Sequence, residues 1–312
     1  MPRAESGTAS LRRWFFARGD ASAAAAVRIG FGLLVLFSLW DLYPVMDLLL
    51  GHSGFYGTLD GRYLPPWGLT TVLFHYDSPI ALRVWFAAAV FCAAFATMGL
   101  YTRAAVPLTL LCLFLVHRRN PYILFGADIV LVNIGLWLTL LRCDRAWSVD
   151  RWIRSRVGDR RSRVIPLWPL KVIQIQVALI YLRTALAKIG TEPWQDGSAV
   201  YYALAALGSD LIPSILQWKL LLTLLTYGAW FIEFSFAVLV FWKPTRWLAL
   251  LSALLLHAGI DVLMAIRLFG LVMVVGLSSF VLPSEWRRLE DWMASRVARV
   301  RAARSVLAPT HV

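Results

Sequence analysis

The stretch LKVIQIQVALIYLRTALAKI, residues 170–189, is an apolar run that ends beside a lysine, and the polar, glycine-rich segment GTEPWQDG, residues 190–197, follows it directly. A helix of about 20 apolar residues is long enough to cross the hydrocarbon core of a bilayer. The whole chain has this character, because 59% of its 312 residues are hydrophobic, 16% are charged and the mean hydropathy is +0.66. Soluble domains are about 45–50% apolar. The sequence therefore predicts an integral membrane protein.

Similar apolar segments along the chain predict the fold class, an all-α, polytopic membrane helix bundle of about eight transmembrane helices. No fixed-period repeat and no long polar stretch separates them, so we expect one transmembrane domain over residues 1–285 and a basic cytoplasmic tail over residues 286–312. The third and eighth segments are short. The predicted spans are 21–43, 80–100, 104–116, 122–141, 170–189, 220–241, 247–262 and 268–282.

The placement of the basic residues indicates topology. The 31 lysines and arginines outnumber the 18 aspartates and glutamates, and most of them cluster in the N-terminal tail and after the second, fourth, sixth and eighth spans. By the positive-inside rule this side is cytoplasmic, so we expect a multi-pass protein of the cell membrane with both termini inside. The excess positive charge then marks orientation and contact with anionic lipid headgroups of the bilayer, not nucleic-acid binding.

The segment SEWRRLEDWMASRVARV, residues 284–300, has the pattern of an amphipathic helix that lies on the cytoplasmic leaflet. Its apolar residues recur at roughly helical spacing opposite a basic face, which is typical of membrane-surface helices. These residues are Trp286, Leu289, Met293, Val297 and Val300.

Two further features are expected to be structural. The outer segment at residues 51–70 is rich in glycine, proline and aromatic residues, and is either a connector or an ordered cap over a site. Cys92, Cys112 and Cys143 show no CxxC spacing, so we expect neither a disulfide nor a metal site.

Lys188, at the outer end of the fifth span, allows two interpretations. In one, its ammonium extends to the lipid headgroups and Trp194 joins the aromatic belt at the interface. In the other, the amine faces the bundle, is desolvated, and in its neutral form takes a proton from a substrate. Arg183 is a second cation in the same span, which either disfavours the charged form of the lysine by repulsion or forms an ion pair with an intramembrane acid.

Polar residues inside predicted spans are costly and suggest function, although each could be a structural pair. His257 lies in the seventh span with Asp261 four residues later, a spacing that lets a carboxylate orient an imidazole. The alternative for His257 is an interhelical hydrogen bond. The other embedded polar residues are Arg28, Asp41, Asp128, Asn133, Gln174, Gln176 and Glu233.

Several stretches together resemble the HTTM family, bacterial membrane proteins similar to vitamin K-dependent gamma-glutamyl carboxylase. In the carboxylase, a tyrosine-containing apolar helix ends in lysine and is followed by an acid-Trp and a glycine turn. In residues 171–204 of this chain, Tyr181, Lys188, Trp194 and Gly197 match that pattern. The resemblance covers about the first 285 residues and extends to VRIGFGLLVLF (27–37), NPYILFGADIV (120–130), WSVD (147–150), IPLW (165–168) and LLLHAGIDVLMAIRLFG (254–270).

This resemblance implies a role for Lys188 as the base that deprotonates vitamin K hydroquinone or a menaquinol. In the carboxylase, reaction of the quinol with oxygen yields an epoxide and a strong base, which removes a proton from a glutamate side chain before CO2 addition. By the same resemblance, His257 lies near the site and can hydrogen-bond quinol or substrate oxygens.

Three differences from the animal carboxylase bear on this chemistry. Asn120 is followed by Pro121 where the carboxylase has an Asn-His step, so a histidine associated with carboxylation is missing. Arg183 replaces an apolar residue. We also expect the chain to lack the large luminal domain that helps the carboxylase to hold its peptide substrate.

Three functions follow as hypotheses. The first is a quinol-dependent, carboxylase-like membrane enzyme with Lys188 as base and His257 and Asp261 in support. The second is a factor for the maturation or processing of a secreted peptide. The third is a transporter or a lipid-binding or small-molecule-binding bundle that uses the embedded charges without catalysis; paired helix breaks in two repeated halves would favour transport, and the sequence shows no such symmetry.

Overall fold

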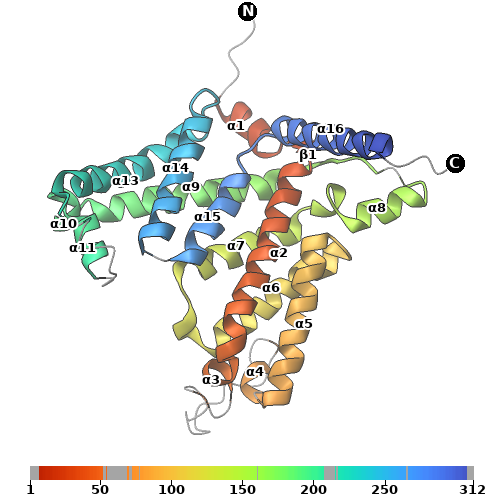
Figure 1. The fold of residues 1–312 in the computed structure, drawn as a ribbon, viewed down its shortest axis with the longest axis horizontal. Coiled ribbons are helices and arrows are strands. Elements are labelled where there is room, and N and C mark those ends of the chain that lie inside the picture. The colour runs from red at the N-terminus through yellow and green to blue at the C-terminus, as the bar shows by residue number, and fades with distance from the viewer. Residues whose placement is uncertain are drawn as a thin grey trace, which may run out of the picture.

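The computed structural model describes residues 7–51, 54, 69, 72–76, 78–159, 161–206, 215, 217–264 and 266–307. Within them the chain is predominantly helical (Figure 1). The predicted outer loop at residues 51–70 lies almost entirely outside these residues. The elements are α1 (Gly7–Phe15), β1 (Arg18–Asp20), α2 (Ser22–Leu42), η1 (Tyr43–Val45), α3 (Met46–Leu50), α4 (Val72–His75), α5 (Pro79–Met98), α6 (Thr102–Arg119), η4 (Pro121–Ile123), α7 (Gly126–Leu140), η5 (Cys143–Arg145), α8 (Val149–Arg156), β2 (Val164–Pro166), α9 (Trp168–Lys188), α10 (Glu192–Gln195), α11 (Ala199–Ala205), α13 (Lys219–Leu239), α14 (Arg246–Met264), α15 (Arg267–Ser278) and α16 (Pro283–Leu307).

The structure confirms an all-helical membrane protein, because every predicted span corresponds to a helix. In the described part of the chain, five helical segments are long and apolar enough to cross a membrane, or up to six if the bent pair α15–α16 forms one span. Two of the remaining helices that were predicted to be spans are too polar at one end or too short to cross a membrane alone. α6 ends in His117, Arg118 and Arg119, and α7 has 15 residues, about 22 Å of helix against a hydrocarbon core of about 30 Å. The number of eight spans therefore stays a prediction.

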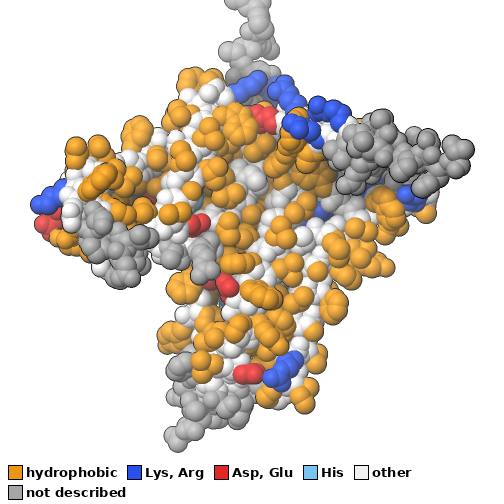
Figure 2. Space-filling view, in the orientation of Figure 1, with side chains coloured by type: hydrophobic (Ala, Val, Ile, Leu, Met, Phe, Trp, Pro, Cys, Tyr) orange, Lys and Arg blue, Asp and Glu red, His pale blue; other side chains and the backbone are white. Residues whose placement is uncertain are grey.

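The helices form two arms that diverge from a common end (Figure 1). In one arm α9 packs on α13 and leads to α10 and α11, and in the other α2 packs on α5 and leads to α3. α14 and α15 lie between the arms, where α15 contacts α2, α7, α9 and α14. The visible surface of both arms is mostly hydrophobic, whereas lysines and arginines gather over α1 and α16 (Figure 2). We call the end formed by α1, β1, β2, η5, α8 and α16 the basic end.

The basic end contains a short antiparallel sheet that the all-α prediction did not include. β1 pairs with β2 in the register Arg18↔Pro166, Gly19↔Ile165 and Asp20↔Val164. Three residues in each strand are too few to produce a recognisable alternation of polar and apolar residues in the sequence. The pairing joins the segment before α2 to the segment before α9, so the two arms start from one connected base.

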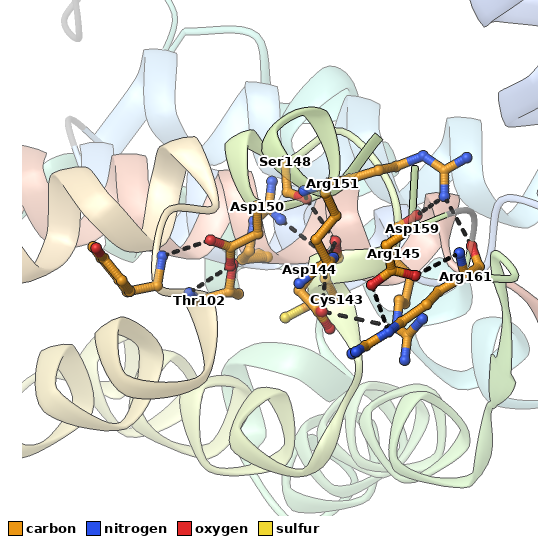
Figure 3. Close-up of polar contacts among 12 residues, drawn as sticks. Thr102, Cys143, Asp144, Arg145, Ser148, Asp150, Arg151, Asp159 and Arg161 are labelled. Atoms are coloured by element: carbon orange, nitrogen blue, oxygen red, sulfur yellow. Dashed lines mark hydrogen bonds and ion pairs between the residues drawn. The ribbon is translucent and has the colours of Figure 1, made fainter. Parts of the chain in front are cut away.

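The WSVD segment, residues 147–150, connects the helices of the basic end. Asp150 accepts hydrogen bonds from the backbone N–H groups of Tyr101 (2.8 Å) and Thr102 (2.9 Å) at the start of α6, and Ser148 caps α8 (Figure 3). The buried Arg28 of α2 donates to the Trp147 carbonyl at 2.6 Å. The Trp147 carbonyl therefore accepts a hydrogen bond from a fully buried guanidinium, and a buried donor left without a partner would cost about 1–3 kcal/mol.

The chain bends by 102° between α15 and α16. Ion pairs then attach α16 to the other elements of the basic end. Arg163 contacts Glu290 of α16 at 3.0 Å and Asp20 at 3.1 Å, and Arg287 of α16 also contacts Asp20 at 2.6 Å. The Trp147 indole donates to Glu290 at 2.9 Å. The tail that was predicted to begin at residue 286 is thus continuous with a helix that begins at Pro283.

The predicted apolar stripe of the tail divides into two parts. The Trp286 ring packs edge-on against Trp147 with centroids 5.4 Å apart, whereas Leu289 and Met293 are exposed. The side chains of Val297 and Val300 lie outside the described residues. Contact of this helix with a membrane leaflet stays a prediction.

The attachment of α16 is expected to weaken in acid. Burial tends to raise the pKa of Asp20 and of Glu290, but hydrogen bonds from Ser22 and Arg287 to Asp20, and from Arg163 and Trp147 to Glu290, lower both pKa values below their ordinary range. Carboxylates with lowered pKa values stabilise the folded state above their unfolded pKa of about 4, and this stabilisation is lost as the pH falls through the folded values. The protection factors of the α16 amides, which compare each exchange rate with the intrinsic rate at the same pH, should therefore fall below about pH 4 and change little between pH 5 and 7.

Glu290→Gln supplies the control for this prediction. The variant should already show accelerated α16 exchange at pH 7, because a neutral amide cannot replace the charge-assisted bonds to Arg163. Equal α16 protection in the variant and the wild type at pH 7 would contradict the role of these ion pairs.

Candidate functional site

A cavity of about 1170 Å³ lies between the arms and is the centre of the candidate site. The ends of α9 and α10, the helices α11, α13 and α14, and the starts of α7 and α15 form its walls. Most of the lining is apolar, and the ionisable side chains on it are Asp41, Lys188 and Glu233. Its apolar residues include Phe125, Leu224, Leu225, Ile232, Leu256, Ile260, Leu263 and Phe269.

Lys188 forms an ion pair with Glu233 of α13 at the wall of this cavity. The Lys188 side chain is 19% exposed and the Glu233 side chain 11% exposed. The Lys188 ammonium also lies over the ring of Trp194, with its nitrogen 4.1 Å from the ring centroid, so a cation–π contact adds to the ion pair. The ammonium is therefore directed at a neighbouring helix, in contrast to an extended, snorkelling lysine.

Glu233 is the site residue that sequence reasoning did not select. It was one of several embedded acids, but it lies 45 residues from Lys188 and no local spacing connects the two. The packing of α9 on α13 brings them together, and the Trp230 indole fixes this packing by donating to the Ala185 carbonyl at 3.0 Å. An unpaired charge within a span is costly, which was the available signal that a lysine in α9 needs an acid from another helix.

The polar turn after α9 is attached to α13, and this attachment places Trp194. Tyr227 of α13 donates its hydroxyl to the Gln195 carbonyl at 2.7 Å. Gly197 has φ +79°, and a Cβ at this position would lie 2.8 Å from Cγ2 of Thr223. Glycine therefore meets two requirements here, a left-handed backbone and close contact with α13.

His257 and Tyr181 form a buried pair behind the cavity wall. The Tyr181 hydroxyl lies 2.7 Å from Nε2 of His257, and the two side chains join α9 to α14. The Tyr181 ring packs against Phe236 with centroids 4.1 Å apart, and the His257 ring lies edge-on to Phe269, whose own side chain lines the cavity.

Asp261 does not orient His257 as the i, i+4 spacing suggested. Among the described residues, neither Nδ1 of His257 nor Oδ1 of Asp261 has a hydrogen-bond partner. The Asp261 carboxylate instead lies against Gly270 of α15 and accepts a hydrogen bond from its backbone N–H. This contact draws the acid toward α15, while Tyr181 supplies the histidine contact.

The other predicted site residues lie elsewhere. Arg183 is exposed and has no ion pair with a described residue. Asn120 is buried in the other arm, where its side chain donates to the Leu49 carbonyl at 3.0 Å and accepts from the Tyr122 backbone N–H at 3.0 Å. The structure thus brings Lys188 and Trp194 together at the cavity, places Tyr181 and His257 behind it, and separates Asn120 and Arg183 from it.

Substitution of Gly197 tests whether the turn depends on contact with α13. Gly197→Ala should lower the melting temperature more than Gly158→Ala, because both glycines have φ near +80° but a Cβ at Gly158 meets nothing within 4 Å. The left-handed backbone costs roughly 1–2 kcal/mol in each variant, so the excess loss in Gly197→Ala reports the clash with Thr223. Equal melting temperatures of the two variants would show that the turn is not packed tightly on α13.

Comparison with known proteins agrees with this architecture. A family model of the HTTM domain matches residues 16–286, which include all the residues of the candidate site. No solved structure matches the chain. The extent of the family match, together with the apolar helices, shows that the chain is a membrane protein that belongs to the HTTM domain family.

Proposed function

We propose that this protein is a quinol-dependent membrane enzyme in which Lys188 is the base. The observation that carries the proposal is the Lys188–Glu233 ion pair at the wall of an apolar cavity of about 1170 Å³. An ion pair at the wall of a large apolar cavity marks a candidate active site.

The cavity fits a quinol with an isoprenoid tail. Small-molecule sites are typically about 300–1,000 Å³ and mostly apolar with a few convergent polar groups, and this cavity has that composition. Its leucine, isoleucine and phenylalanine side chains suit the ring and the tail, while Lys188 and Glu233 can face a ring hydroxyl. When bound, the quinol would supply the reducing equivalents for reaction with oxygen.

Proton transfer would use both members of the ion pair. An ammonium cannot accept a proton, so Nζ of Lys188 must first release one, and Glu233 is in direct contact to receive it. The neutral Nζ can then take the proton of the ring hydroxyl, which restores the ammonium and leaves Glu233 protonated. Trp194 holds the ammonium form of Nζ in position before and after the transfer, because its ring attracts the positive charge.

Tyr181 and His257 would act as positioning residues. They do not line the cavity, but the His257 ring contacts Phe269 and the Tyr181 ring contacts Phe236, so they fix the wall against which a ring would pack. The carboxylation of a glutamate side chain is not part of the proposal.

We also propose that the basic end faces the cytoplasm, in a cell-membrane protein with both termini inside. The arginine-rich α1, α8 and α16 support this orientation under the positive-inside rule (Figure 2).

Single cysteines would test the orientation. A cysteine at Thr8 or Ser295 in a cysteine-free background should resist a membrane-impermeant maleimide in intact cells and react after permeabilisation. A cysteine at Ser78, at the far end of α5, should react without permeabilisation. The reverse pattern would overturn the proposed orientation.

Turnover by the purified protein in lipid nanodiscs tests the enzyme proposal. With reduced vitamin K or a menaquinol under oxygen, the wild type should form the epoxide, and Lys188→Arg and Glu233→Gln should each reduce the rate by about 100-fold or more. Arginine keeps the cation but does not become a neutral base, and glutamine cannot receive the proton.

Lys171→Arg is the matched control for this experiment. Lys171 lies on the same helix and also contacts a tryptophan ring, that of Trp14 at 4.6 Å, but it does not line the cavity. Its substitution should leave turnover unchanged. Wild-type rates in Lys188→Arg would exclude the lysine as the base, and absence of turnover with every quinol would contradict the enzyme proposal.

A further inference from the structure

A second cavity, of about 350 Å³, lies at the basic end, away from the candidate active site. It separates the start of α6 from the end of α7 and the η5 turn, so Thr102 and Arg103 face Leu141, Arg142 and Cys143 across it. Thr102 and the Cys143–Asp144 turn lie near one another in Figure 3. No residue of the Lys188–Glu233 pair or its surroundings belongs to this cavity.

The cavity presents positive charge that the described part of the protein does not neutralise. Arg142 lines it and is partly exposed; its Nη1 is closed to solvent and has no hydrogen-bond partner among the described residues. Arg103 also lines it, is exposed, and forms no ion pair within the described residues. Two arginines that line one cavity suit an anion such as phosphate, because the planar guanidinium group donates several hydrogen bonds.

Other arginines offset the charge of the nearby acid. Asp144, which also lines the cavity, contacts Arg154 at 2.8 Å and Arg145 at 3.7 Å through Oδ2, whereas its buried Oδ1 has no hydrogen-bond partner among the described residues. The carboxylate of Asp150 accepts hydrogen bonds from the Thr102 backbone N–H and hydroxyl. These contacts neutralise or occupy the negative groups, so the charge of Arg103 and Arg142 remains for a ligand.

Apart from Thr102 and Thr139, the remaining lining is apolar and continues onto the outer surface. Val106, Pro107, Leu138 and Leu140 line the cavity, and Leu140 is 54% exposed. Leu108, which directly follows Pro107 on α6, and Leu136, which lies one turn before Leu140 on α7, are exposed large apolar side chains as well. Phosphate binding therefore adjoins a surface that suits hydrocarbon chains, which distinguishes it from a site for a soluble anion.

We propose that this cavity binds the headgroup of an anionic phospholipid. The phosphate lies between Arg103 and Arg142, and the acyl chains follow the exposed leucines of α6 and α7. The volume of about 350 Å³ suits a headgroup of the size of phosphoglycerol and excludes the lipid tails, which leaves them outside the protein. Basic pockets between transmembrane helices are a recognised form of lipid-headgroup site.

Native mass spectrometry of the purified full-length protein tests the proposal with phosphatidylglycerol as the probe. The wild type should retain one phosphatidylglycerol more tightly than phosphatidylcholine, and Arg103→Gln/Arg142→Gln should weaken retention by about tenfold or more. Arg12→Gln/Arg118→Gln removes the same charge from exposed arginines outside the cavity and should retain the lipid like the wild type.

Two further measurements complete this experiment. Arg142→Lys preserves a charge, so it should fold and retain more lipid than Arg142→Gln even if the double variant is unstable. Inorganic phosphate at millimolar concentration should not displace the lipid; displacement would identify a soluble phosphate ligand and overturn the proposal. Equal weakening in the cavity pair and the control pair would show nonspecific attraction and also overturn it.

Discussion

The pairing of charges inside an apolar bundle is the constraint on which this structure depends. A charge among apolar helices has no water to solvate it, so another element of the protein must contact it. Lys188 contacts Glu233 and Trp194, and Arg28 contacts backbone carbonyls such as that of Cys143 at 2.8 Å. Each contact joins helices that are distant in sequence. The charged residues therefore add specific contacts between helices, while the apolar residues provide most of the buried core.

The helices themselves could be predicted because their signal is local. The length of each apolar run gave an element that the structure confirms, for example residues 170–189 against α9 at Trp168–Lys188. The divergence of the two arms could not be predicted. It depends on which face of each apolar helix packs on another helix and which face contacts lipid, and both kinds of face are apolar. The strands β1 and β2 were not predicted for another reason, which is that three-residue strands are too short to show a periodic pattern.

The sequence located the central residues of the candidate site, but not the residues that contact its supporting side chains. The helix end, lysine and Gly197 turn located Lys188 and Trp194, which line the same cavity. The contact of His257 with Tyr181, and of Asp261 with Gly270, follows from the packing of α14 against α9 and α15. A spacing of four residues shows only that two side chains share a helix face; it does not show which neighbour attracts each one.

The α9–α13 arm also constrains how the large cavity can change shape. Sliding α13 along α9 by one helical turn, about 5.4 Å, would separate Lys188 from Glu233 and break the Trp230–Ala185 hydrogen bond together. The Tyr227–Gln195 bond would break as well, so the polar turn would have to move with α13. These three contacts together fix the position of α13 along α9. A change in the shape of the cavity that keeps these bonds must therefore come from the other elements that line it, such as α14 and α15.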